Sequence, residues 1–169
     1  TCEGIISSNR LMKLVVVSGK FDPIDAGHMA LLEGASELGN YVIVGLNSDE
    51  AVKSDKGFVY QSYEEREKVL KGIKYVNGVN FFDDVEQWPI TDLLKKVRYW
   101  YPSDEIIYAS GCEKGDSRDY SPDTVLSANI QDVKFMYNVG GNIKKREPEK
   151  RTFSYESWRR LCKGIGAII

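Results

Sequence analysis

The residues of this sequence best suited to chemistry lie between positions 19 and 28, which read Gly-Lys-Phe-Asp-Pro-Ile-Asp-Ala-Gly-His. They include His28, the only histidine of the 169-residue chain. A glycine-containing turn that leads from a strand into a helix suits phosphate, because backbone N–H groups and the helix N-terminus favour an anion there. The spacing differs from the G-x-x-x-x-G-K-[ST] phosphate loop and from the G-x-G-x-x-G dinucleotide motif. The segment therefore predicts a phosphate site of another kind.

Several other polar residues have two interpretations when each is taken alone. Lys56, in a polar stretch, is either a phosphate ligand or a solvated charge. Arg66, one turn into an expected helix, is suited to bidentate phosphate binding or is a charge on the helix surface. Asp49 follows a buried strand, where it is either part of the site or a plain helix cap. His28 likewise is either a phosphate ligand or a histidine at the surface or at a helix start. Residue type does not decide between these interpretations.

Five short apolar runs predict β-strands, with helical patterns and caps between them. The expected strands are residues 14–17, 41–46, 79–82, 106–109 and 133–139. The expected helices are residues 29–38, residues 62–73 with a capping box at Ser62–Glu65, residues 91–100, a short helix after Ser121-Pro122, and a last helix that begins near Ser154. Residues 47–61 read as a polar loop and residues 140–150 as a basic one. The alternation predicts an α/β fold with a doubly wound, five-stranded parallel sheet of Rossmann-like type, which binds ligands beyond the carboxyl ends of its strands.

The composition is that of an ordinary soluble globular protein, with 42% hydrophobic and 28% charged residues. A net charge of -2 argues against a nucleic-acid partner that is bound by bulk electrostatics. No apolar run approaches the roughly 20 residues that span a bilayer, and residues 1–10 lack the basic start and apolar stretch of a signal peptide. We therefore expect a cytoplasmic protein without membrane contact, in which residues 1–11 are a leader or an added tail and residues 12–169 form one domain.

The cysteines and the single histidine limit the metal chemistry. Cys2, Cys112 and Cys162 are far apart and show no C-x-x-C spacing, so they indicate neither a structural zinc site nor a disulfide framework. With one histidine, the chain has no site built from several histidines.

Residues 19–28 resemble the GxFDxxHxGH signature of the cytidylyltransferase-like nucleotidyltransferases. Further blocks, in the order and spacing of the glycerol-phosphate cytidylyltransferase branch, extend the resemblance over about residues 12–160: residues 47–50, 56–57, 60–66, 73–76, 110–116 and 151–154. The resemblance implies transfer of a cytidylyl group from CTP to a phosphorylated polyol or sugar, with release of pyrophosphate. It also implies Mg²⁺ as cofactor and a homodimer. ATP-using relatives share the signature, so adenylyl transfer stays open.

The same resemblance implies roles for single residues. His28, Lys56 and Asp25 occupy catalytic positions, and Arg66 with Asp49 occupies the position for the phosphate of the acceptor. The nucleotide-binding positions are Gly19, Lys20, Phe21, Asp22, Gly27, His28, Gly111, Asp116, Arg151, Thr152 and Ser154. No residue is identified as a metal ligand.

Asp25 departs from the family pattern, which has a histidine at this position to stabilise charge as the bond to pyrophosphate breaks. A carboxylate about 4 Å from a phosphate charge is repelled by about 4 kcal/mol at an effective dielectric near 20. Three explanations are open: Asp25 recruits Mg²⁺, the chain binds nucleotide but turns over poorly, or Asp25 is an engineered change. Residues 154–157 also lack the adjacent hydroxyls that the family places on the β- and γ-phosphates.

Three functions are consistent with these patterns. The first is nucleotidyl transfer, and the second is nucleotide binding without useful catalysis. The third is a doubly wound domain that binds some other small anion. Pyrophosphate release separates the first from the second, and nucleotide affinity separates the second from the third.

Overall fold

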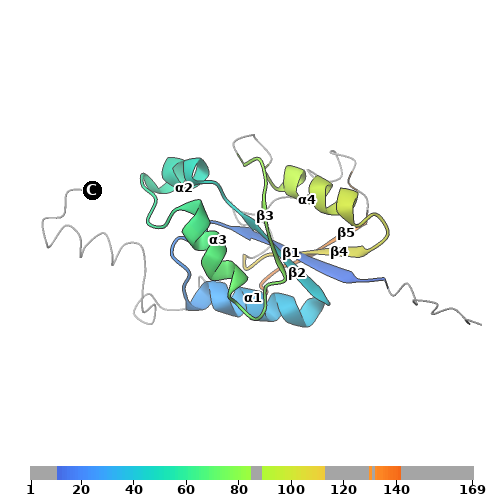
Figure 1. Ribbon diagram of the computed structural model, residues 1–169. Coiled ribbons are helices and arrows are strands. Elements are labelled where there is room, and N and C mark those ends of the chain that lie inside the picture. Colours follow the sequence, from blue (N-terminus) through green and yellow to red (C-terminus); the bar gives the residue numbers. More distant parts are fainter. Residues whose placement is uncertain (1–10, 85–88, 113–129, 131, 142–169) are drawn as a thin grey trace, which may run out of the picture.

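The computed structural model describes residues 11–84, 89–112, 130 and 132–141, which form a parallel sheet with helices on both faces (Figure 1). The five strands are β1 (Lys13–Gly19), β2 (Tyr41–Leu46), β3 (Gly78–Phe81), β4 (Glu105–Ala109) and β5 (Val133–Met136). Each neighbouring pair is parallel, and the order in the sheet is β3-β2-β1-β4-β5. The expected five-stranded parallel sheet is confirmed.

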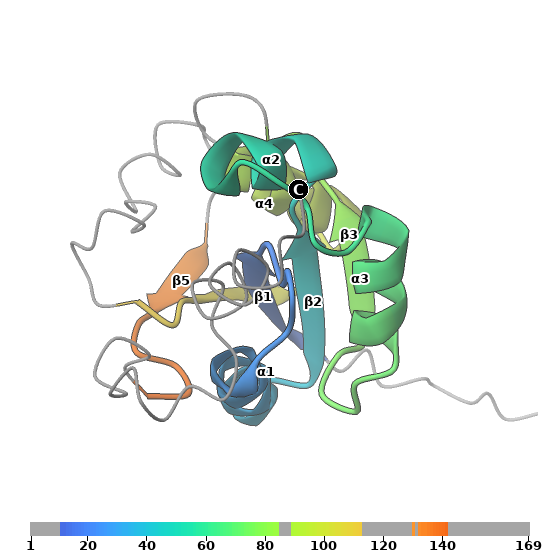
Figure 2. The same ribbon diagram turned by 90° about the vertical axis from the view of Figure 1, so that its left-hand side faces the viewer.

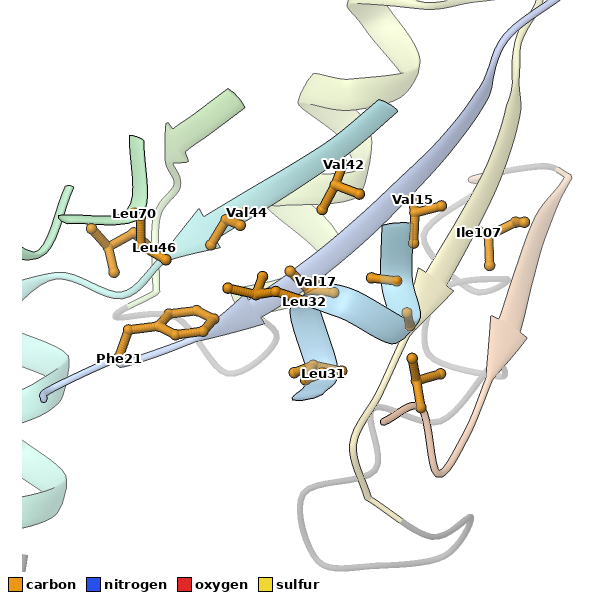
Figure 3. Close-up of a cluster of buried hydrophobic side chains, with 13 residues drawn as sticks. Val15, Val17, Phe21, Leu31, Leu32, Val42, Val44, Leu46, Leu70 and Ile107 are labelled. Atoms are coloured by element: carbon orange, nitrogen blue, oxygen red, sulfur yellow. The ribbon is translucent and has the colours of Figure 1, made fainter. Parts of the chain in front are cut away.

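Helices cover both faces of this sheet. The described helices are α1 (Ala26–Leu38), α2 (Asp49–Lys56), α3 (Tyr63–Lys71) and α4 (Pro89–Trp100). α1 and α4 lie on opposite faces (Figure 2). Val15 and Val17 of β1 pack in the core that contains α1 residues (Figure 3), whereas Leu14 and Val16 pack in the core that contains α4 residues. Burial on both faces explains why the strands read as continuous apolar runs rather than alternating ones.

The strand order reverses beside β1. The chain runs from β1 to β2 and β3 on one side, and then returns to β4 on the other side of β1. Gly19 pairs with Leu46 of β2, and Val16 pairs with Tyr108 of β4. Loops that leave two such strands in different directions open a crevice at their carboxyl ends, which is where open α/β sheets bind ligands.

The helices differ from the expectation mainly at the start of α1 and at α2. α1 begins at Ala26 rather than residue 29, because Asp25 is its N-cap. Residues 47–61 are not a continuous loop, because they contain α2, which Ser48 caps and which ends at Gly57 with a left-handed φ of 88°. Val52 is the buried residue of α2. A helix that buries so little has no apolar periodicity from which to predict it.

The remaining differences lie at the ends of elements. The capping box of Ser62 and Glu65 is confirmed at the start of α3. β5 ends at Met136 rather than residue 139, because Asn138 adopts a left-handed φ of 56° and turns the chain out of the sheet. The expected helices after Ser121-Pro122 and near Ser154 lie outside the described residues. Among the helices that are described, none has the length and apolar character needed to cross a membrane.

Candidate functional site

A pocket of about 310 Å³ lies at the carboxyl ends of β1 and β4, where the strand order reverses. Its volume is near the lower end of the range for small-molecule sites. The lining comes from the end of β1 and the loop after it, from α1, from the segments around β2 and α2, and from the end of β4. It consists of Ser18, Gly19, Lys20, Phe21, Asp22, His28, Leu31, Asn47, Lys56, Tyr108, Ala109, Ser110, Gly111 and Cys112.

His28 reaches this pocket from the first turn of α1, where a reciprocal pair of hydrogen bonds fixes it. The backbone N–H of His28 donates to Oδ1 of Asp25 at 2.9 Å. The backbone N–H of Asp25 donates to Nδ1 of the imidazole at 3.1 Å. The ring of Phe21 lies 5.0 Å from the imidazole, centre to centre, and restricts it further. The backbone N–H and the carboxylate of Asp25 both lie against Nδ1, so Nε2 is the nitrogen available to a ligand.

Asp25 has a structural partner that its residue type alone does not reveal. Its Oδ1 also lies 3.0 Å from Nδ1 of His28. Partial burial opposes ionisation, but the hydrogen bonds and the charge of His28 outweigh it and hold the pKa of the Asp25 carboxyl well below its usual range. The carboxylate therefore stays charged and caps α1. It does not belong to the pocket lining.

Two lysines bring positive charge to the pocket. Nζ of Lys56, in the last turn of α2, donates to the backbone carbonyl of Asp22 at 2.6 Å. Burial lowers the pKa of Lys56; the carboxyl of Asp22 opposes that shift without cancelling it, and the charge of Lys20 adds to it. Lys20 itself pairs with Asp55 of α2. Both cations lie in the lining with His28, which makes the pocket suited to phosphate.

Asp22 holds the loop after β1 in place. Its side chain is almost fully buried, with 3% of the residue exposed. The carboxylate accepts hydrogen bonds from the backbone N–H groups of Tyr60, at 2.9 Å, and of Gln61, at 2.7 Å. These bonds tie the loop after β1 to the segment before α3. The carboxylate of Asp22 thus positions the lining by binding backbone amides.

Arg66, predicted to hold the phosphate of the acceptor, lies outside the pocket lining. It is fully buried on the inner side of α3. Its guanidinium donates to the backbone carbonyls of Lys20 (2.7 Å), Asn47 (2.9 Å) and Gln61 (3.0 Å), and to Asp49 at 2.5 Å. Asp49 therefore serves as the ion-pair partner of Arg66, and neither residue lines the pocket. The pair binds together three loops that surround the site.

Asp84 is a further organising residue that the sequence analysis did not identify. Its carboxylate accepts hydrogen bonds from Nδ2 of Asn47 (3.0 Å), from the backbone N–H of Ser48 (2.7 Å) and from Oγ of Ser48 (2.7 Å). Asn47 lines the pocket, so Asp84 orients a lining residue. Its position just after an expected strand, at the carboxyl edge of a parallel sheet, was the available signal.

Ser18 and Tyr108 form another pair that was not predicted. Their hydroxyl oxygens are 2.9 Å apart across β1 and β4, and both residues line the pocket. Each lies at or near the carboxyl end of its strand. The sequence placed both within expected strands or at their ends, but it gave no reason to pair them.

The structure brings most of the described site candidates together. Those in the lining are Gly19, Lys20, Phe21, Asp22, His28, Lys56 and Gly111. Gly27 is buried within α1 and outside the lining. Asp116, Arg151, Thr152 and Ser154 lie outside the described residues. Within the part of the chain that the structure describes, no group of three or more His, Cys, Asp or Glu side chains is placed to hold a metal ion.

Comparison with known proteins places these features in a family. The cytidylyltransferase-like family model matches residues 16–153. The bifunctional protein HldE of Campylobacter concisus is 40% identical over 98 residues, which cover 57% of this chain and 20% of that protein. The glycerol-3-phosphate cytidylyltransferase of Bacillus subtilis is 41% identical over 68 residues, which cover 40% of this chain and 53% of that protein. The chain thus matches only a fifth to about half of the length of these two relatives.

The fold has a counterpart among solved structures. The lipopolysaccharide core biosynthesis protein from Thermoplasma volcanium GSS1 superposes with a TM-score of 0.57 at 18% sequence identity. The match covers 75% of this chain and 95% of that chain. At this identity the likeness supports the Rossmann-like fold alone.

Proposed function

This chain belongs to the cytidylyltransferase-like family, and from that premise we propose that it transfers a cytidylyl group from CTP to a phosphorylated polyol or sugar. A phosphate oxygen of the acceptor attacks the α-phosphorus of CTP, the bond from that phosphorus to the bridging oxygen of the β-phosphate breaks, and pyrophosphate leaves. The likeness to a glycerol-3-phosphate cytidylyltransferase supports both the nucleotide and the acceptor class. Such a reaction depends on positioning and on neutralising charge, with no covalent protein intermediate.

The observation that carries the proposal is the meeting of His28, Lys20 and Lys56 in one pocket at the switch point of the sheet. Nε2–H of His28 donates to the α-phosphate and strengthens that bond as negative charge grows there. The two ammonium groups offset the charge of the triphosphate. The first turn of α1 adds its backbone dipole to the same region.

Mg²⁺ and a second copy of the chain remain part of the proposal. We expect Mg²⁺ to enter with the triphosphate and to be held mainly by phosphate oxygens and water, its usual mode. The carboxylates of Asp22 and Asp25 fit this, because Asp22 is bonded to two backbone amides and Asp25 to His28. Sedimentation of the full chain tests the expected homodimer.

Asp25 favours a second candidate, which is nucleotide binding without useful turnover. The family signature supplies two imidazoles, and this chain supplies only His28. Loss of one donor to a developing oxyanion typically slows a reaction by roughly a hundredfold to a thousandfold. Under this candidate the chain binds CTP or ATP and releases no pyrophosphate.

The test is pyrophosphate release by the full chain with Mg²⁺, CTP or ATP, and phosphorylated polyols and sugars. We expect release with CTP, and a rate that falls by roughly a hundredfold to a thousandfold in His28→Ala. Lys95→Ala, which removes an exposed lysine of α4, is the matched control and should leave the rate unchanged. Release with ATP alone would correct the nucleotide. Nucleotide binding with no release would select the second candidate, and neither binding nor release would reject both.

A further inference from the structure

The Asp25 side chain is turned toward the helix that it caps. Oδ1 accepts the backbone N–H of His28 at 2.9 Å and lies 3.0 Å from Nδ1 of the same residue. A carboxylate that repelled a triphosphate, or that ligated a metal for it, would have to present its oxygens to the pocket. Asp25 is absent from the pocket lining, whereas His28 is part of it.

The contacts at Nδ1 serve both protonation states of the imidazole. In the neutral ring, Nδ1 accepts the backbone N–H of Asp25 at 3.1 Å, so the proton is on Nε2. In the charged ring, Nδ1 carries a proton and faces the carboxylate at 3.0 Å. In both states Nε2 carries a proton and is a donor. Among the described residues, Nε2 makes no hydrogen bond.

We propose that Asp25 is a positioning residue that acts on the nucleotide only through His28, by holding Nδ1 so that Nε2–H points at the phosphates. The inference rests on the proposed function, because it assigns a role within that site. A buried carboxylate behind a catalytic imidazole orients the ring and stabilises its charged form in many unrelated enzymes. Here the carboxylate of Asp25 stands at the position where the family signature has its first histidine. The same carboxylate caps α1 and holds the ring of His28.

A double-mutant cycle on kcat tests this proposal. Asp25→Asn keeps a good N-cap but removes the charge. We expect kcat to fall by roughly tenfold to a hundredfold, as when a carboxylate behind a metal-bound histidine is removed, with little change in KM. In the His28→Ala background the same substitution should have no further effect. Glu37→Gln, which removes an exposed carboxylate from the same helix, is the control and should change nothing in either background.

Other outcomes of the cycle would overturn the proposal. If Asp25→Asn slowed His28→Ala by the same factor as it slows the unmodified chain, Asp25 would act on the nucleotide or on its metal directly. If Asp25→Asn raised the rate or lowered KM in both backgrounds, its charge would oppose the nucleotide. Asp25→Ser, which also keeps a cap oxygen but withdraws it from the ring, should behave as Asp25→Asn does.

A second readout separates the failure of this inference from the failure of the proposed function. His28 is the only histidine of the chain, so long-range ¹H–¹⁵N spectra of the full chain report its two ring nitrogens without overlap. We expect Asp25→Asn to shift the Nδ1 signal more than the Nε2 signal, and Glu37→Gln to shift neither. If Asp25→Asn and Glu37→Gln both shifted the Nδ1 signal by the same small amount, the conclusion that Asp25 holds Nδ1 would be overturned. If the chain releases no pyrophosphate, the proposed function fails, and the shift of the Nδ1 signal then decides the clamp by itself.

Discussion

The apolar core and the polar site of this protein are held together in different ways. In the core, side chains of the sheet and of α1 pack on one another, as Val15, Val17 and Leu32 do in Figure 3. At the site, buried charged side chains bond to the backbone of neighbouring loops, as Arg66 and Asp22 do. Packing tolerates small shifts at a graded cost, whereas a buried charge that loses its partner is expensive at once. The site therefore depends on few residues, and the core on many.

The largest effect that this comparison predicts is for Arg66→Met. The substitution fills similar space but leaves three backbone carbonyls without their donor, at about 1–3 kcal/mol each. We therefore expect the free energy of unfolding to fall by more than about 3 kcal/mol. Nucleotide affinity should fall with it, because the loops at Lys20 and Asn47 separate. Denaturant unfolding and CTP titration measure the two effects. Lys68→Ala, which removes an exposed cation of the same helix, should change neither stability nor affinity. An Arg66→Met variant that is as stable as the unmodified chain and binds CTP normally would contradict the difference between core and site.

A smaller loss of stability, with no loss of chemistry, is expected in the core. Leu94 of α4 is fully buried on the face of the sheet opposite α1. Leu94→Ala should lower the free energy of unfolding by about 3 kcal/mol through lost burial and the cavity left behind. Because Leu94 is not in the lining, the kcat of the folded fraction should stay the same. A fall in kcat as large as that of Arg66→Met would show that core and site are not separable.

The smallest expected effect is on the pH dependence of kcat/KM, through the ionisation of Lys56. Burial lowers the pKa of its ammonium, with the carboxyl of Asp22 opposing. A lowered lysine pKa means that the positive charge is lost at a lower pH, so kcat/KM should fall on the alkaline side before exposed lysines titrate. Lys56→Arg should abolish that fall, since a guanidinium keeps its charge. Lys53→Arg, on the exposed side of α2, should leave the profile as it is.

The same contrast explains what the sequence alone could predict. Residues 14–17 and 41–46 are continuous apolar runs, and Ser62 with Glu65 is a standard capping box, so these elements follow from pattern, as does the parallel direction of the strands. The pocket follows from the fold, because ligand sites of such sheets lie at the switch point. Side-chain direction does not follow: nothing in the residue type of Arg66 shows that α3 turns it inward.

Asp25 shows the limit most clearly. Capping boxes are recognised by Glu or Gln at the third helical position, and here that position holds His28. The sequence analysis therefore did not predict the capping box, and it treated Asp25 only as a charge in the place of a histidine. Only the distances from Nδ1 to the backbone N–H and to the carboxylate reveal the clamp.

The most direct test of the account is the initial rate of Mg²⁺-dependent pyrophosphate release from CTP by the unmodified chain, set beside that of Asp25→His. The account predicts that the unmodified chain releases pyrophosphate, because Asp25 holds His28 in its working orientation. Release by Asp25→His alone would contradict it, and would mean that the carboxylate silences a site that is otherwise intact.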